Sequence, residues 1–144
     1  MKKQSIILLA MALLMLSACE SSSKTTKKCA GKIAGQNAEA TLIGEKENLL
    51  EMELRNEFDY KGSGITKEQL KSSESLIISD FLGIDGVSAN LEVNDEMAFI
   101  VINIDFEKVK IKDLEKIGFA GNILSNNDFG SVVKFLEKGG MTCK

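Results

Sequence analysis

A run of alternating residues in the middle of the chain constrains the fold more than any other feature. From Leu50 to Tyr60, apolar and charged residues occupy alternate positions, and only Asn56 interrupts the apolar set. The apolar set is Leu50, Met52, Leu54, Phe58 and Tyr60, and the charged set is Glu51, Glu53, Arg55, Glu57 and Asp59. Because successive side chains of a strand point to opposite faces, this pattern predicts a long antiparallel strand with one buried and one wet face.

Three further segments predict strands. Ala38–Ile43 precedes the long strand, and Val87–Val93 and Met97–Phe106 follow it. The last two are separated by Asn94-Asp95-Glu96, whose residue types favour a hairpin loop. The Met97–Phe106 segment carries Phe99 and Val101 on its second face, which predicts a central position in the sheet.

Helical spacing appears in three other places. Thr66 and Gln69 form a capping-box pattern that predicts a helix from Lys67 to about Phe81, and a shorter helix is expected over Lys110–Ile117. The last helix follows Asn126-Asn127-Asp128 and has its apolar stripe at Phe129, Val132, Val133 and Leu136. The order ββαββαα predicts the α+β class: a two-layer sandwich with an antiparallel sheet of about four strands and helices packed on one face.

The N-terminus predicts export and a lipid anchor. Two lysines precede an uncharged run of 11 residues, Ile6 to Leu16, too short to span a bilayer and typical of a signal peptide, here residues 1–18. Leu16-Ser17-Ala18-Cys19 resembles the lipobox of bacterial lipoproteins, in which the cysteine is lipidated and becomes the first mature residue. We therefore expect a protein anchored through Cys19 on the extracytoplasmic side of a cell membrane, although the sequence leaves open which membrane of a two-membrane envelope.

The anchor is followed by a polar segment. Residues 19–28 contain no apolar residue after Cys19, so we expect a disordered tether there and a single α+β domain over residues 29–144. Of the remaining cysteines, Cys29 and Cys143 bracket that domain, and outside the cytoplasm we expect them to form a disulfide. A redox-active pair and two free thiols are the alternatives.

Composition excludes several classes of function. The chain has no histidine, which removes Ser-His-Asp, Cys-His and histidine-bearing zinc sites. Removal of the signal peptide takes away two of the 18 basic residues and none of the 21 acidic ones, leaving a formal charge of −5. That balance argues against nucleic acid as a partner. We expect no cofactor and no metal.

An ordered series of short motifs resembles the YehR-like lipoproteins, a domain-of-unknown-function family. The motifs are Gly64-Ile-Thr-Lys-Glu68, Gly86-Val87, Ile104-Asp-Phe106, Leu114-Glu-Lys-Ile-Gly118 and Val132-Val-Lys-Phe-Leu-Glu-Lys-Gly139. The resemblance covers nearly all the mature chain. It implies a two-layer α/β sandwich on a lipid-anchored extracytoplasmic protein, and it implies no activity, ligand or catalytic residue.

The wet face of the predicted sheet is the candidate binding surface. Its residues are Glu51, Glu53, Glu57, Glu92, Phe99 and Val101. Converging carboxylates could hold a cation or a cationic peptide, and the two apolar residues would add a contact spot. The alternative is a solvated face whose like charges prevent edge association.

The sequence therefore favours a non-enzymatic domain that binds an envelope protein or a small ligand. The alternative is a small carboxylate-dependent enzyme acting on cell-wall polymers. Asp85, Asp95 and Glu96 would supply its carboxylates, although all three also suit turns.

Overall fold

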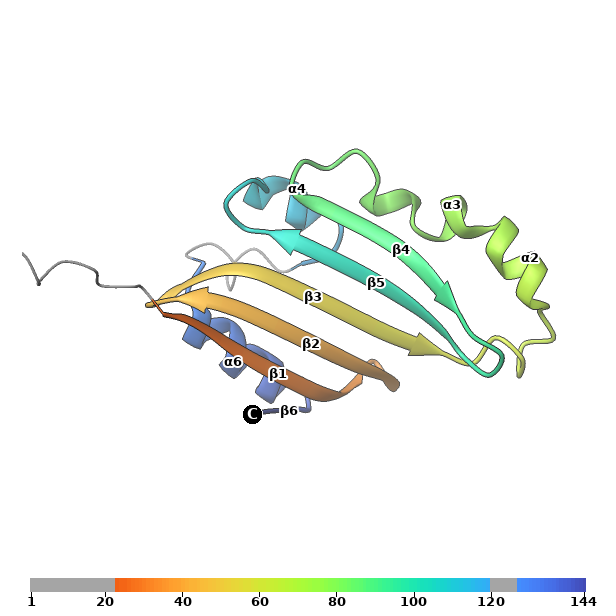
Figure 1. Ribbon diagram of the computed structural model, residues 1–144, viewed down its shortest axis with the longest axis horizontal. Helices are drawn as coiled ribbons and strands as arrows, with labels where there is room; N and C mark the ends of the chain where they lie inside the picture. The colour runs from red at the N-terminus through yellow and green to blue at the C-terminus, as the bar shows by residue number, and fades with distance from the viewer. Residues whose placement is uncertain (1–22, 120–126) are drawn as a thin grey trace, which may run out of the picture.

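A six-stranded antiparallel sheet forms one layer of the molecule (Figure 1). The computed structural model describes residues 23–119 and 127–144, so the predicted signal peptide and Cys19 lie outside the described residues. The strands are β1 (Lys24–Ile33), β2 (Gln36–Glu45), β3 (Asn48–Phe58), β4 (Val87–Val93), β5 (Ala98–Asp105) and β6 (Met141–Cys143). Their spatial order is β4-β5-β3-β2-β1-β6, which places β5 inside the sheet as predicted.

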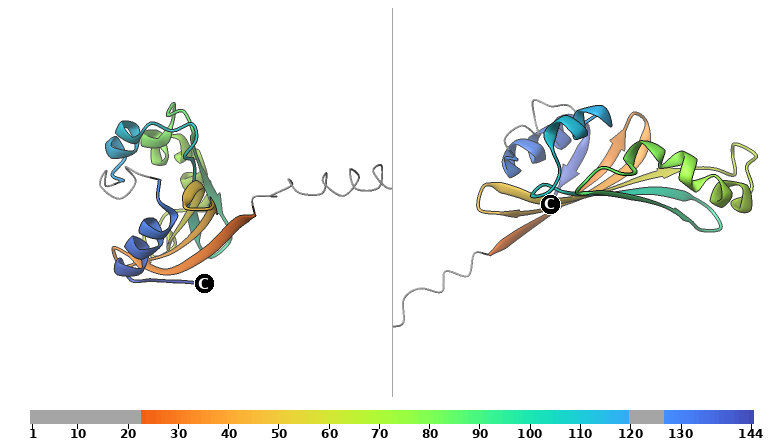
Figure 2. Two further views of the ribbon diagram at one scale, coloured as in Figure 1. Left: turned by 90° about the vertical axis from the view of Figure 1, so that its left-hand side faces the viewer. Right: turned by 90° about the horizontal axis from the view of Figure 1, so that it is seen from above.

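The helices form the second layer, and those in the described ranges lie on one face of the sheet (Figure 2). They are α2 (Lys67–Ser72), α3 (Glu74–Ile77), the 3-10 turn η1 (Ser79–Phe81), α4 (Ile111–Lys116) and α6 (Phe129–Lys138). The predicted α+β class is confirmed. Within the described part of the chain, no helix is long and apolar enough to cross a bilayer.

The prediction of about four strands is wrong because β1 and β6 were missed. Lys24–Lys28 was assigned to a disordered tether, yet it forms the first half of β1 and pairs with β2 from Lys24↔Glu45 to Ile33↔Gln36. This half has no apolar alternation, so ladder hydrogen bonds to β2 hold it in place. The connecting turn, Ala34-Gly35, has φ of 50° and 86°, the positive angles that a two-residue hairpin requires.

The second missed strand, β6, covers only three residues at the edge of the sheet. It pairs with β1 from Cys29↔Cys143 to Gly31↔Met141. Gly31 permits this approach, since a Cβ there would lie 2.7 Å from the Met141 Cα atom. The tertiary contact with β1 therefore creates β6, which its own length does not predict.

The predicted helix over Lys67–Phe81 is broken into three pieces. Its start is as expected: Thr66 accepts a hydrogen bond from the Gln69 backbone N–H, and the Gln69 side chain accepts one from the Thr66 N–H. The breaks fall at Ser73 and Ile78. The Glu74 carboxylate then accepts a hydrogen bond from the Leu91 N–H, at the outer edge of β4, at 3.0 Å. The interruption thus lets α3 cover an otherwise open strand edge.

Two clusters of buried side chains make up the core. The larger contains the inner-face residues of β2, β3 and β5 together with Leu114 of α4 and the predicted stripe of α6, Phe129, Val132, Val133 and Leu136. The smaller contains Tyr60, Leu70 and Ala98. The Asp128 carboxylate caps α6 by accepting a hydrogen bond from the Ser131 N–H at 2.6 Å, as the sequence predicted. One side of the sheet therefore remains without a helical cover.

Candidate functional site

The uncovered side of the sheet, called here the open face, carries the predicted surface residues. β3, β5 and β4 pair in a register that places Glu57 opposite Phe99 and Phe99 opposite Glu92. All six candidates, Glu51, Glu53, Glu57, Glu92, Phe99 and Val101, have the strand parity of this face. Their use in binding stays a prediction.

Arg55 stands in the middle of the predicted acidic face and changes its character. Its guanidinium lies 2.7 Å from a Glu92 carboxylate oxygen and 4.2 Å from the centre of the Phe99 ring. The planar cation thus pairs with an acid and stacks on an aromatic ring at the same time. A neighbouring amide, Asn37 Nδ2, donates to Glu57 at 2.9 Å. The open face therefore carries both signs of charge, with Arg55 paired to Glu92 among the predicted acidic residues.

The predicted apolar contact spot is also incorrect in part. Val101 is only 4% exposed, between its pairing partners Arg55 and Asn90. Phe99 is half-buried beneath the Arg55 guanidinium. These two side chains support the charged residues above them and offer little free apolar area.

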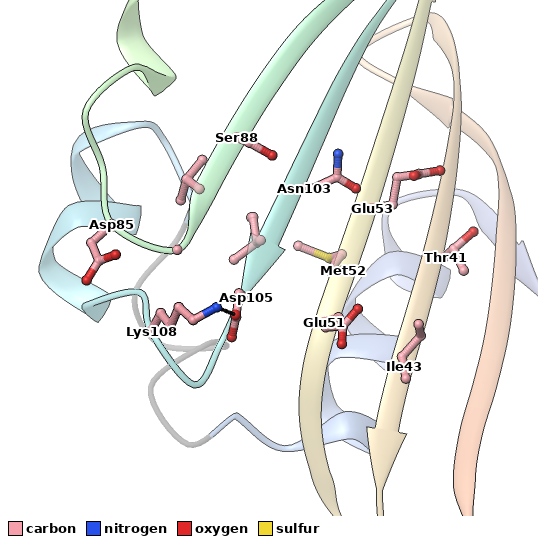
Figure 3. Close-up of a pocket in the computed structure, with 13 residues that line it drawn as sticks. Thr41, Ile43, Glu51, Met52, Glu53, Asp85, Ser88, Asn103, Asp105 and Lys108 are labelled. Atoms are coloured by element: carbon pink, nitrogen blue, oxygen red, sulfur yellow. Dashed lines mark ion pairs between the residues drawn. The ribbon is translucent and has the colours of Figure 1, made fainter.

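A hollow of about 660 Å³ occupies the open face near the C-terminal end of β5 (Figure 3). Glu51, Glu53 and Asp105 line it together with Thr41, Asn103 and Lys108. Lys108 Nζ lies 2.7 Å from Asp105, and this hydrogen bond holds the pKa of the Asp105 carboxyl below its usual value. The carboxylates in this hollow do not form a cluster of potential metal ligands among the residues that the structure describes.

Two further hollows extend the surface toward β1. One, of about 650 Å³, is lined by residues that include Lys32, Glu39 and Arg55. The other, of about 1090 Å³, includes Lys28, Lys144 and Thr142. Glu53 borders the first and last hollows, and Arg55 borders the last two, so the three form one continuous surface. Lys28 could not be predicted as part of this surface, because Lys24–Lys28 has no apolar alternation that would indicate a strand.

The carboxylates proposed for catalysis do not meet. Asp85 precedes β4 and Asp95 follows it, so the seven-residue strand separates them by roughly 20 Å. The Asp95 carboxylate instead accepts a hydrogen bond from Lys67 Nζ at 2.7 Å, and this contact lowers the pKa of Asp95. A general acid needs a raised pKa, so this pair does not form the acid–base site considered from the sequence.

The expected disulfide is present. Cys29 and Cys143 are joined with an S–S distance of 2.02 Å. Cys29 is 1% exposed and belongs to the larger core cluster, and Cys143 packs against that cluster. The position suits a structural bond that fastens β6 to β1 better than it suits a redox-active pair, whose attacking sulfur must be accessible.

Comparison with known proteins identifies the family. The family model described as a protein of unknown function, DUF1307, matches residues 25–141. The chain belongs to the DUF1307 family. The match includes every candidate residue of the open face and Cys29, and it ends before Cys143.

Relatives of this DUF1307 chain agree with the resemblance to YehR-like lipoproteins. An uncharacterized lipoprotein of Listeria monocytogenes, Lmo0207, is 24% identical over 143 residues, covering 98% of this chain and 91% of the relative. The NMR structure of the E. coli YehR protein superposes with a TM-score of 0.67 at 19% identity, covering 84% of this chain and 92% of that one. An NMR structure from Streptococcus pneumoniae TIGR4 has a TM-score of 0.57 at 12% identity, with 92% of each chain covered. The solved structures share the fold, and the family resemblance is confirmed.

Proposed function

We propose that this DUF1307 protein is a lipid-anchored, extracytoplasmic lipoprotein that binds another component of the cell envelope through the open face, without catalysing a reaction. One observation carries the proposal: the helices leave this face uncovered, and its hollows join into one surface that carries both signs of charge. Interfaces of this kind gain specificity and association rate from charge complementarity.

The anchor follows from the N-terminal sequence and is supported by the relative from Listeria, which is itself named a lipoprotein. β1 begins at Lys24, only five positions after Cys19. Five residues reach at most roughly 17 Å, so a lipid on Cys19 would keep the start of β1 close to the headgroups. The binding surface would then stand beside the membrane at short range.

Binding is favoured over chemistry by the state of the charged groups. On the open face, the hydrogen bond from Lys108 lowers the pKa of Asp105, which lines the first hollow. Ionised, paired carboxylates suit recognition of a charged partner, and they are poor proton donors at neutral pH.

The test combines anchoring with site-specific cross-linking in intact cells. A photoreactive amino acid replaces Ser88 or Thr142 on the open face, or Lys134 on the exposed side of α6 as a control. The expected result is one protein or wall fragment captured from both open-face positions and absent from the α6 position. Glu53→Lys should reduce capture at least fivefold, whereas Glu137→Lys, the same charge reversal on α6, should leave capture unchanged.

Two results would contradict the proposal. Capture from Lys134 alone would assign binding to the helical layer. The Cys19→Ala variant cannot be acylated at this position. If it stayed in the membrane fraction, the lipid on Cys19 would not be the anchor, even if the open face captured a partner.

A further inference from the structure

An apolar groove lies on the helical side of the sheet, on the face opposite the proposed binding surface. Its volume is about 340 Å³, within the size range of small-molecule sites. Leu54, Asn56 and Ile102 of the sheet line it from below, and Phe81, Phe119 and Phe135 come from three separate segments of the helical layer. Phe135 is 46% exposed, so a large aromatic side chain marks the rim.

The groove lies at the edge of the larger core cluster, which supplies Met52, Leu54, Ile102, Val132 and Leu136 to its lining. The larger cluster lies under α4 and α6, and the smaller one includes Leu70 of α2. Asn56 pairs with Ala38 of β2 on one side and with Ile100 of β5 on the other. Of the β3 residues that line the groove, Met52 and Leu54 are buried and Asn56 is half-buried, so solvent reaches the inner face of β3 at Asn56.

Asn56 is the residue that interrupts the apolar alternation of β3. Among the described residues that line the groove, it alone has an amide, hydroxyl or charged side chain. No hydrogen bond joins its amide to the side chain or backbone of another described residue, whereas the amides of Asn37, Asn94 and Asn127 are all hydrogen-bonded. Asn56 is half-buried, and no buried side-chain nitrogen or oxygen among the described residues lacks a partner, so its amide reaches solvent at the mouth of the groove and is free to bond a ligand. Leucine would continue the apolar stripe and remove this hydrogen-bonding group.

We propose that this groove binds a small uncharged amphiphile. An aliphatic or aromatic body would lie between Phe81, Phe119 and Phe135, and one hydroxyl or amide group would hydrogen-bond to the Asn56 side chain. Because none of the described residues lining the groove is charged, an anionic or cationic head group would be desolvated there without a counter-charge from them. This selects alcohols and amides over fatty acids and amines.

The test uses the full-length lipoprotein in nanodiscs and a photoreactive analogue of 1-octanol. Adducts are located by mass spectrometry and their saturation gives an affinity. We expect saturable adducts confined to peptides that contain Phe81, Phe119 or Phe135. Asn56→Leu should weaken capture of the alcohol by about three- to tenfold, which corresponds to the usual contribution of one hydrogen bond. The same variant and the wild type should capture the matching photoreactive alkane equally.

Asn90→Leu is the matched control, because it makes the same substitution on the opposite face of the sheet, outside the hollows described there. It should bind the alcohol like the wild type, and thermal unfolding confirms that both variants are folded. Adducts that do not saturate, or equal capture of the alcohol by Asn56→Leu, would overturn the proposal. A second copy of the protein could instead cover the groove. Weaker labelling of the groove peptides at higher protein concentration and a fixed amount of probe would show this and would also overturn the proposal.

Discussion

Cys29 on β1 and Cys143 on β6 lie directly opposite each other, with Cα atoms 4.0 Å apart and a disulfide between them. The bond joins positions 114 residues apart. One residue further along, Lys28 and Lys144 exchange two backbone hydrogen bonds of 3.1 and 2.9 Å. The disulfide therefore closes nearly the whole domain into one loop and holds a three-residue edge strand that could not persist alone.

Replacing both cysteines, Cys29→Ser and Cys143→Ser, should lower stability strongly. The chain-entropy treatment gives about 4 to 5 kcal/mol for a loop of this length, which corresponds to roughly 15 °C in melting temperature. Thermal unfolding with and without reductant measures the effect, and reduced wild type should melt with the double variant. Equal melting temperatures for oxidised and reduced wild type would show that β6 is held by other contacts.

Parts of the fold could be predicted because their patterns are local. The alternation of β3 and the stripe of α6 need only neighbouring residues, and both elements form as expected. β1 could not be predicted in the same way, because Lys24–Lys28 carries no apolar alternation and its turn uses Ala34 at a positive φ. The pairing with β2 overrides this weak local preference.

Two glycines beside the same aromatic ring should respond to alanine in opposite directions. In β2, a Cβ at Gly44 would collide with the Phe129 ring and lie 2.9 Å from the Asn48 carbonyl oxygen. Gly44→Ala should therefore destabilise by about 1 to 3 kcal/mol. At Gly130, within α6, the nearest atom is 3.7 Å away. Gly130→Ala should stabilise by about 0.5 kcal/mol, because alanine favours the helix. Urea unfolding of both variants measures the change in the free energy of unfolding. If Gly44→Ala lost no stability, Phe129 of α6 would not lie against Gly44.

The cap of α6 predicts a dependence of stability on acid. Hydrogen bonds from the Ser131 side chain and backbone lower the pKa of Asp128 from its ordinary value of 3.8. The folded state therefore binds this proton less readily than the unfolded state, so the cap stabilises fully above that value and is lost as the pH falls through the folded pKa.

Asp128→Asn keeps a capping oxygen that does not titrate. The variant should lose less stability than the wild type between about pH 5 and pH 2. The slopes of the free energy of unfolding against pH should differ by the equivalent of at most one proton. Chemical unfolding at several pH values measures the slope. Parallel curves for the two proteins would mean that the Asp128 charge contributes nothing to the cap.

The candidate site shows a different limit of sequence reasoning. Strand parity alone placed Glu51, Glu53 and Glu57 on one face, which the pairing of β3 with β5 reproduces. The contact of Arg55 with Glu92 depends on the register of β3, β5 and β4, whose order in the sheet differs from their order along the chain. Long-range register cannot be read from alternation, so the pairing of Arg55 with Glu92 could not be predicted from the sequence.

The short spacer predicts which end of the sheet faces the lipid. The turn between β2 and β3 lies beside the start of β1, since Lys24 pairs with Glu45, whereas the hairpin between β4 and β5 lies at the other end of β3, roughly 30 Å away. Because the chain has no tryptophan, Glu47→Trp and Glu96→Trp each introduce a single fluorophore at one of these ends. Brominated lipids should quench the fluorescence of the acylated Glu47→Trp protein at least twofold more than that of Glu96→Trp. A ten-residue Gly/Ser insertion after Ser22 should abolish the difference, because the longer spacer releases the domain from the headgroups. Equal quenching of the two acylated proteins would contradict a fixed orientation, and acylation itself is checked by the mass of each protein.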